Sequence, residues 1–272
     1  MLKTRVMTAA VLLAVFLSAL FLLPKDGWIA FCAVLLGVAA WEWGALAALA
    51  AFIRTLYAAL VVGLFVLPEV VADSWARGPY APAWIYYAAA SFWLVLVPVW
   101  IWRQPRLGSR ALLLAAGATA LVPAAAALVD LRGVHPSLLL AVLGTVWISD
   151  TAAYFIGRRF GRHKLAPSIS PGKTWEGVAG ALAAVGLYAL AWAYLGSVLA
   201  WIGPMKVAPA WILPVLLGLA VAGIIGDLFE SLIKRQAGVK DSGTLLPGHG
   251  GILDRIDAPL AMLPLAVLAF MR

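Results

Sequence analysis

The stretch from Ser231 to Asp257 concentrates residue types that could do chemistry at phosphate groups. It reads SLIKRQAGVKDSGTLLPGHGGILDRID, in which carboxylates, basic side chains and glycines stand close together. The chain as a whole is 64% hydrophobic and only 12% charged. Charged groups in a membrane protein are costly unless they face water, a partner or a substrate. We therefore expect a functional site here; the alternative is a solvated loop between two membrane spans.

Acidic residues at both ends of this stretch have the spacing of a helical face. If the preceding apolar run continues as helix to Arg235, four polar side chains fall on one face. These are Asp227, Glu230, Ser231 and Lys234. Asp254 and Asp257 stand three residues apart at the start of the last apolar run, which also places them on one face. Carboxylates so placed suit a divalent cation, and the neighbouring bases suit phosphate.

Glycines surround a single histidine in residues 247–251, which read PGHGG. This segment cannot be regular helix, and its glycines allow backbone N–H groups to approach an anion closely. His249 could act as a general base or as a phosphate ligand. A zinc site is not expected, because the chain has three histidines and one cysteine, Cys32, and none of them has ligand spacing.

A second polar stretch lies upstream, from Ser149 to residue 177. Asp150 falls inside or near the end of a predicted span, and Tyr154 follows one turn later on the same face. The basic loop after it contains Lys173 and could serve only as an orientation signal and lipid anchor. It is not a P-loop, because an upstream glycine and a preceding strand are missing. Ser170-Pro171 predicts a helix N-cap followed by proline, opening a short helix.

These stretches resemble the phosphatidate cytidylyltransferase family, also called CDP-diacylglycerol synthase. The resemblance rests on SLIKR, KDSG and LPGHGGILDRID in residues 231–257, and on SDTAAY, GR and ISPGKTWEG in residues 149–177. Ala152 departs from the pattern, where glycine is expected, and this puts local packing in doubt. The resemblance extends from Ser149 to the C-terminus; residues 1 to about 130 are recognisable only as apolar spans. It implies an enzyme that joins CTP to phosphatidic acid, releases pyrophosphate and leaves CDP-diacylglycerol in the bilayer.

The residues expected to form this site fall into three groups. The expected catalytic residues are Asp227, Lys234, Arg235, Lys240, Asp241, His249, Asp254, Arg255 and Asp257. Those expected to bind substrate groups are Ser231, Gly248, Gly250, Gly251, Lys173 and Asp150. Asp227, Asp254 and Asp257 are the expected Mg²⁺ ligands, with one ion or two left open. The alternative pairs these three acids with Arg255, Lys234 or Arg235 in salt bridges that only tie helix ends together.

Apolar runs of membrane-spanning length recur along the chain and predict an all-α polytopic integral membrane protein. They lie approximately at 6–23, 28–52, 55–72, 83–102, 110–129, 137–157, 177–202, 209–229 and 257–271. We read the first run as a retained span rather than a signal peptide, which gives about nine transmembrane helices. Residues 1–136 are expected to form a scaffold, and residues 137–272 the catalytic region with loops 158–176 and 232–256.

Loop charge predicts a cytoplasmic N-terminus. With that orientation, all of the 20 basic residues lie on the cytoplasmic side except Lys25, Arg77, Arg132, Lys206 and Arg272. Both polar stretches then face the cytoplasm, and we expect a protein of the bacterial inner membrane with its active site on that face. The net charge of +8 fits anionic lipid headgroups and nucleotide phosphates rather than nucleic acid. Whether the protein forms a homodimer is left open.

Two other functional classes compete with the cytidylyltransferase interpretation. A transporter would place its intramembrane acids near the bilayer midplane between related halves, whereas here they gather toward one face. A CDP-alcohol phosphotransferase would carry the motif D-G-x-x-A-R, but Asp26-Gly27 is followed by Trp-Ile-Ala-Phe. Glu42, a lone acid between two tryptophans, could equally lie near the membrane interface and snorkel, so no role is assigned to it.

Overall fold

The chain folds into a bundle of membrane-length helices. The structure, a computed structural model, describes residues 2–71, 79–105, 109–199, 208–246, 248 and 250–271. The helices in these ranges are α1 (Leu2–Leu22), α2 (Lys25–Leu46), α3 (Ala51–Val71), α4 (Ala83–Ser91), α5 (Val97–Arg103), α6 (Arg110–Val134), α7 (Pro136–Phe160), α8 (Trp175–Leu199), α9 (Pro209–Gln236) and α10 (Leu253–Met271). A π-helical turn, η2 (Phe92–Leu96), joins α4 to α5.

The helices coincide with the apolar runs of the sequence, and the all-α membrane class is confirmed. In the described part of the chain, seven helices are long and apolar enough to cross a membrane, counting α4 to α5 as one. The apolar part of α1, Val6–Leu22, is shorter, and α10 is not among the seven. A count of nine spans requires that both α1 and α10 cross the membrane, and this crossing stays a prediction.

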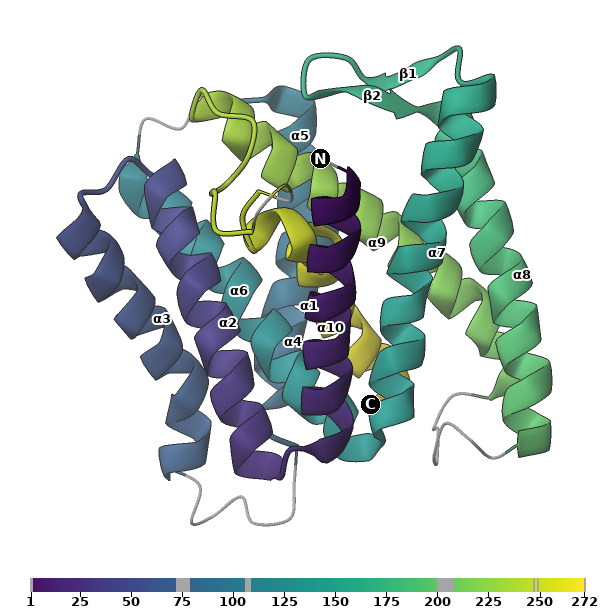
Figure 1. Ribbon diagram of the computed structural model, residues 1–272, viewed down its shortest axis with the longest axis horizontal. Helices are drawn as coiled ribbons and strands as arrows, with labels where there is room; N and C mark the ends of the chain where they lie inside the picture. Colours follow the sequence, from purple (N-terminus) through teal and green to yellow (C-terminus); the bar gives the residue numbers. More distant parts are fainter. Residues whose placement is uncertain are drawn as a thin grey trace.

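Successive helices run up and down the bundle. Figure 1 shows a small β-hairpin and the connection between α9 and α10 at the same end, toward which the start of α1 also points. The C-terminus of α10 lies toward the opposite end. The two polar stretches of the sequence therefore meet at one end of the bundle, as a shared site requires. That this end faces the cytoplasm stays a prediction.

The hairpin corrects one expectation from the sequence. It consists of β1 (Lys164–Ala166) and β2 (Ser170–Thr174), which pair antiparallel. The prediction that a short helix begins at Ser170-Pro171 is therefore wrong. The N-cap lies further along the chain, because the Oγ1 atom of Thr174 accepts a hydrogen bond from the Gly177 N–H at 3.1 Å. The helix that follows, α8, accordingly begins at Trp175.

The hairpin is attached to the end of α9. Its buried turn residue Ile169 packs with Leu228 and Leu232 of that helix. The Nε atom of Arg235 also donates a hydrogen bond to the Ile169 carbonyl oxygen at 3.3 Å. These contacts hold a basic hairpin strand beside the acidic face of α9.

Small residues let α10 lie close to its neighbours. It packs against α9, α6, α4 and α7, and one hydrophobic core includes residues from both predicted parts of the chain. At the crossing with α9, a Cβ atom on Gly226 would lie only 2.5 Å from the carbonyl oxygen of Asp257. Because Asp227 follows Gly226 directly, this close approach brings two acidic residues of different helices together.

Candidate active site

A cavity of about 850 Å³ opens between α7, α9, α10 and the hairpin. This volume is typical of small-molecule sites in proteins. Eleven of the residues predicted from the sequence line it: Asp150, Lys173, Asp227, Ser231, Lys234, Arg235, Lys240, Asp241, Asp254, Arg255 and Asp257. The fold therefore brings both polar stretches of the sequence to one site, which spacing along the chain could suggest but not establish.

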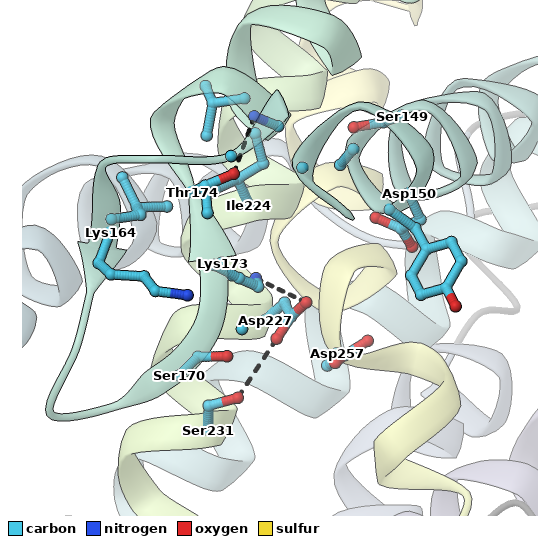
Figure 2. Close-up of a pocket in the computed structure, with 18 of the residues that line it drawn as sticks. Ser149, Asp150, Lys164, Ser170, Lys173, Thr174, Ile224, Asp227, Ser231 and Asp257 are labelled. Atoms are coloured by element: carbon cyan, nitrogen blue, oxygen red, sulfur yellow. Dashed lines mark hydrogen bonds and ion pairs between the residues drawn. The ribbon is translucent and has the colours of Figure 1, made fainter. Parts of the chain in front are cut away.

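Asp227 is the point where the two stretches touch. Its Oδ2 atom lies 2.6 Å from the Nζ atom of Lys173, which β2 carries across the cavity. Its Oδ1 atom accepts a hydrogen bond from the Ser231 hydroxyl, one helical turn later, at 3.3 Å (Figure 2). Both members of the ion pair are only partly buried. Lys173 therefore neutralises Asp227 but remains accessible to an anion entering the cavity.

Two further carboxylates share the cavity with Asp227. Figure 2 shows Asp257 close to Asp227, with Asp150 on the α7 side. The Oδ1 atom of Asp257 accepts a hydrogen bond from the neighbouring Ala258 N–H at 2.9 Å. Among the residues that the structure describes, no group of three or more His, Cys, Asp or Glu side chains would hold a metal ion by itself. A cation here would need oxygen atoms from a substrate or water to complete its coordination.

Asp254 lies in a different environment from Asp227 and Asp257. Its Oδ1 atom is 2.5 Å from the Nζ atom of Lys234, which also lies 2.6 Å from a carboxylate oxygen of Glu230. Its Oδ2 atom accepts hydrogen bonds from the backbone N–H and hydroxyl of Ser242 and from the N–H of Gly251, at 2.9, 3.0 and 2.8 Å. This geometry matches the salt-bridge alternative for Asp254, because both carboxylate oxygens have partners and only 5% of the side chain is exposed, against 29% for Asp227.

Gly250 and Gly251 of the α9–α10 connection lie against Asp254, and neither they nor Gly248 are among the described residues that line the cavity. Gly248 and Gly250 have φ angles of 75° and 80°, in the left-handed region that favours glycine. A Cβ atom on Gly250 would lie 2.5 Å from the Oδ2 atom of Asp254. These contacts give the glycines a part in folding the loop, and their contact with a substrate phosphate stays a prediction. His249 lies outside the described residues.

Glu42 of α2 supports this loop, and the sequence did not indicate this role. Its side chain is buried, with 2% exposed, so it does not snorkel at the interface. It accepts hydrogen bonds from the N–H groups of Ile252 and Leu253 at 3.0 and 2.9 Å and from the Ser242 hydroxyl at 3.1 Å. Glu42 thus caps the N-terminus of α10. Its lone charge in an apolar helix was a signal, but its partners lie about 200 residues away.

The remaining basic residues leave positive charge facing the cavity. Arg235 is engaged by backbone oxygens, since besides Ile169 it donates to the carbonyl of Val239 at 3.2 Å. Lys240 and Arg255 are exposed and line the cavity, and neither forms an ion pair within the described ranges. Cations that are not held in a direct ion pair are available for an anionic ligand.

Comparisons with known proteins point to one family across the whole chain. The model of the cytidylyltransferase family matches residues 3–271, which includes the N-terminal helices that carried no recognisable motif. Phosphatidate cytidylyltransferase of Pseudomonas aeruginosa is 39% identical over 97% of this chain and 95% of that protein. The Haemophilus influenzae protein of the same name is 34% identical over 97% of this chain and 96% of its own. The Bacillus subtilis protein is 44% identical over 44% of this chain and 42% of its own.

Proposed function

Because this chain belongs to the cytidylyltransferase family, we propose that it converts CTP and phosphatidic acid to CDP-diacylglycerol and pyrophosphate. The observation that carries the proposal is the cavity at one end of the membrane helices. It combines carboxylates with the cations Lys240 and Arg255, which form no direct ion pair with any residue that the structure describes. Such a position is accessible both to a lipid headgroup and to a water-soluble nucleotide. A transporter would not need this one-sided collection of phosphate-binding side chains.

The proposed reaction is an in-line displacement at the α-phosphorus of CTP. An oxygen of the lipid phosphate forms a bond to that phosphorus, and the bond from phosphorus to the bridging oxygen breaks, so pyrophosphate leaves. Both reactants are anions, and their repulsion is the main obstacle. Lys173, Lys240 and Arg255 would lower it by placing positive charge beside the reacting phosphates. No strong general base is required, because a phosphate monoester is already ionised near neutral pH.

The cavity fits Mg²⁺ held jointly by protein and substrate. We propose Asp227 and Asp257 as its carboxylate ligands, because they lie close together and carboxylate oxygens are ligands that Mg²⁺ prefers. When bound, the ion would neutralise charge on the CTP phosphates. Asp254, predicted from the sequence as a third ligand, is instead proposed to position Lys234 and the loop. The number of metal ions and the formation of a homodimer stay open.

The proposed orientation places the cavity on the cytoplasmic face of the bacterial inner membrane, where CTP is available. Labelling can test this cleanly, because the single cysteine, Cys32, is buried. Ser168→Cys in the hairpin turn should react in inverted vesicles and stay protected from an impermeant thiol reagent in spheroplasts. Ala208→Cys, at the start of α9, should show the reverse pattern. Labelling of Ser168→Cys in intact spheroplasts would contradict both the orientation and the nucleotide assignment.

The proposed activity is tested with purified protein in detergent, radiolabelled CTP and phosphatidic acid. Lipid-extractable label should form only when both substrates and a divalent cation are present. Omitting the lipid, or adding a chelator, supplies the control for each requirement. No lipid-extractable label with any divalent cation would favour the transporter class.

A further inference from the structure

One face of α7 changes from polar to apolar beside the active site. Leu143, Trp147, Asp150 and Tyr154 follow one another at spacings of four, three and four residues, so they lie on one face of the helix. Asp150 and Tyr154 line the reaction cavity. Leu143 and Trp147 line a second cavity, of about 190 Å³. The second cavity therefore continues along α7 from the first.

Helix α10 shows the same change on the opposite wall. Arg255 lines both cavities, whereas Pro259 and Leu263, one and two turns later, line only the second. Arg255 forms no ion pair with any residue in the described part of the chain. A cation that forms no direct ion pair with these residues thus stands where the polar cavity meets the second one.

The rest of the second cavity is apolar, and small residues stand beside Leu121 and Leu128 on its α6 wall. Ala124 and Ala125 of α6 line it, together with Cys32 of α2 and Phe16 of α1. Phe16 also contacts the ring of Trp28 edge-on, with centroids 6.0 Å apart. Among the described lining residues, Arg255 is the only one that carries a charge. Figure 1 shows α1 passing in front of α10, between α2 and α7.

We propose that this apolar cavity holds an acyl chain of phosphatidic acid while Arg255 contacts the lipid phosphate. The inference rests on the proposed function and names how its lipid substrate is held. An anionic headgroup joined to a hydrocarbon chain matches a cation at the edge of an apolar cavity. We call this second cavity the slot. Three of the helices that line the slot, α2, α6 and α7, are long and apolar enough to cross a membrane, so a lipid chain can enter it without first crossing water.

We expect the slot to position the lipid substrate for reaction rather than to increase its overall binding affinity. A hydrocarbon chain gains little by leaving bilayer lipids, because those are as apolar as leucine side chains. Close packing of the chain against Trp147 and Leu260 instead fixes the position of the phosphate near Arg255. Chain length should therefore change kcat/KM, and a blocked slot should remove that dependence.

A matched pair of substitutions in α6 tests this directly. Ala125→Phe fills the slot, and Ala115→Phe adds the same ring at an exposed position of the same helix. With dioleoyl phosphatidic acid, we expect Ala125→Phe to lower kcat/KM by about tenfold or more. With dihexanoyl phosphatidic acid, both variants should stay near the wild type. Equal losses on both lipids, or no loss on either, would overturn the proposal.

A second variant and a labelling experiment keep the proposal testable if Ala125→Phe does not fold. Trp147 is 45% exposed, so Trp147→Ala should fold and should lower kcat/KM for the dioleoyl lipid alone. Phosphatidic acid with a photoactivatable acyl chain should label residues 143–147 and 256–263 of the wild type. Labelling confined to α3, which faces outward, would contradict the slot. If the wild type makes no product from either lipid, the proposed function fails rather than the slot.

Discussion

Glu42→Gln tests whether a residue of the N-terminal part positions the active site. The Oε1 atom of Glu42 accepts from the Ile252 N–H, and its Oε2 atom accepts from the Leu253 N–H and the Ser242 hydroxyl. Glutamine keeps the size of the side chain but replaces one of these oxygens with an NH₂ group. In its best orientation the amide oxygen retains the two contacts of Oε2, and the NH₂ group then faces the Ile252 N–H.

The expected cost follows from these contacts. One hydrogen bond to a charged acceptor is lost, which is worth about 1.5–3 kcal/mol. The negative charge at the N-terminus of α10 is lost as well, worth about 0.3–1 kcal/mol. The ordered α9–α10 connection should therefore be destabilised by roughly 2–4 kcal/mol. Because this connection carries Lys240 and leads into Arg255 and Asp257, we expect kcat/KM to fall by about ten- to a hundredfold.

Hydrogen exchange separates this positioning role from general destabilisation. The amides of Ile252 and Leu253 should exchange about tenfold faster or more in Glu42→Gln, while the core of α6 stays protected. Glu69→Gln is the matched control, since Glu69 forms an ion pair with Lys25 that is largely exposed. Unchanged exchange at Ile252 and Leu253 together with wild-type activity would refute the reasoning.

Three further substitutions test other parts of the site. Asp227→Asn should lower turnover by about a hundredfold or more in folded protein, with partial recovery at high Mg²⁺ or with Mn²⁺; a lower melting temperature with normal turnover would instead show a structural pair. Lys234→Met leaves Asp254 without its buried cation and should destabilise the protein by about 3–5 kcal/mol in a denaturant titration; unchanged stability would rule out the network. Gly226→Val forces α9 away from α10 and should cost about 1–3 kcal/mol and most of the activity. Gly218→Val, on the same helix with no atom within 4 Å, should cost much less, and equal effects would contradict the close crossing.

Residue periodicity was sufficient to predict the helices, and the charge cluster together with the family resemblance predicted eleven of the residues that line the cavity. The helical continuation of α9 through Lys234 and Arg235 is confirmed, because α9 ends at Gln236. That continuation carries Asp227 and Ser231 on one face, as the spacing indicated. Local spacing works here because the face of a helix depends only on residues within a few turns.

Features that depend on tertiary contacts were not predictable from spacing. The hairpin from Lys164 to Thr174 was missed because its strands are short and Ser170-Pro171 is compatible with a helix start. The different environments of Asp254 and Asp257 arise from Lys234 and from the folded loop, which no local pattern encodes. The role of Glu42 likewise requires a contact between the first and last parts of the chain.

Transfer of the α-phosphorus of CTP to phosphatidic acid is the central claim. Its most direct test compares α-labelled with γ-labelled [³²P]CTP, each incubated with phosphatidic acid, Mg²⁺ and the purified wild-type protein. The label of α-labelled CTP should become lipid-extractable as CDP-diacylglycerol, and the label of γ-labelled CTP should appear only in pyrophosphate. Lipid-extractable label from γ-labelled CTP, or none from either nucleotide, would contradict the account.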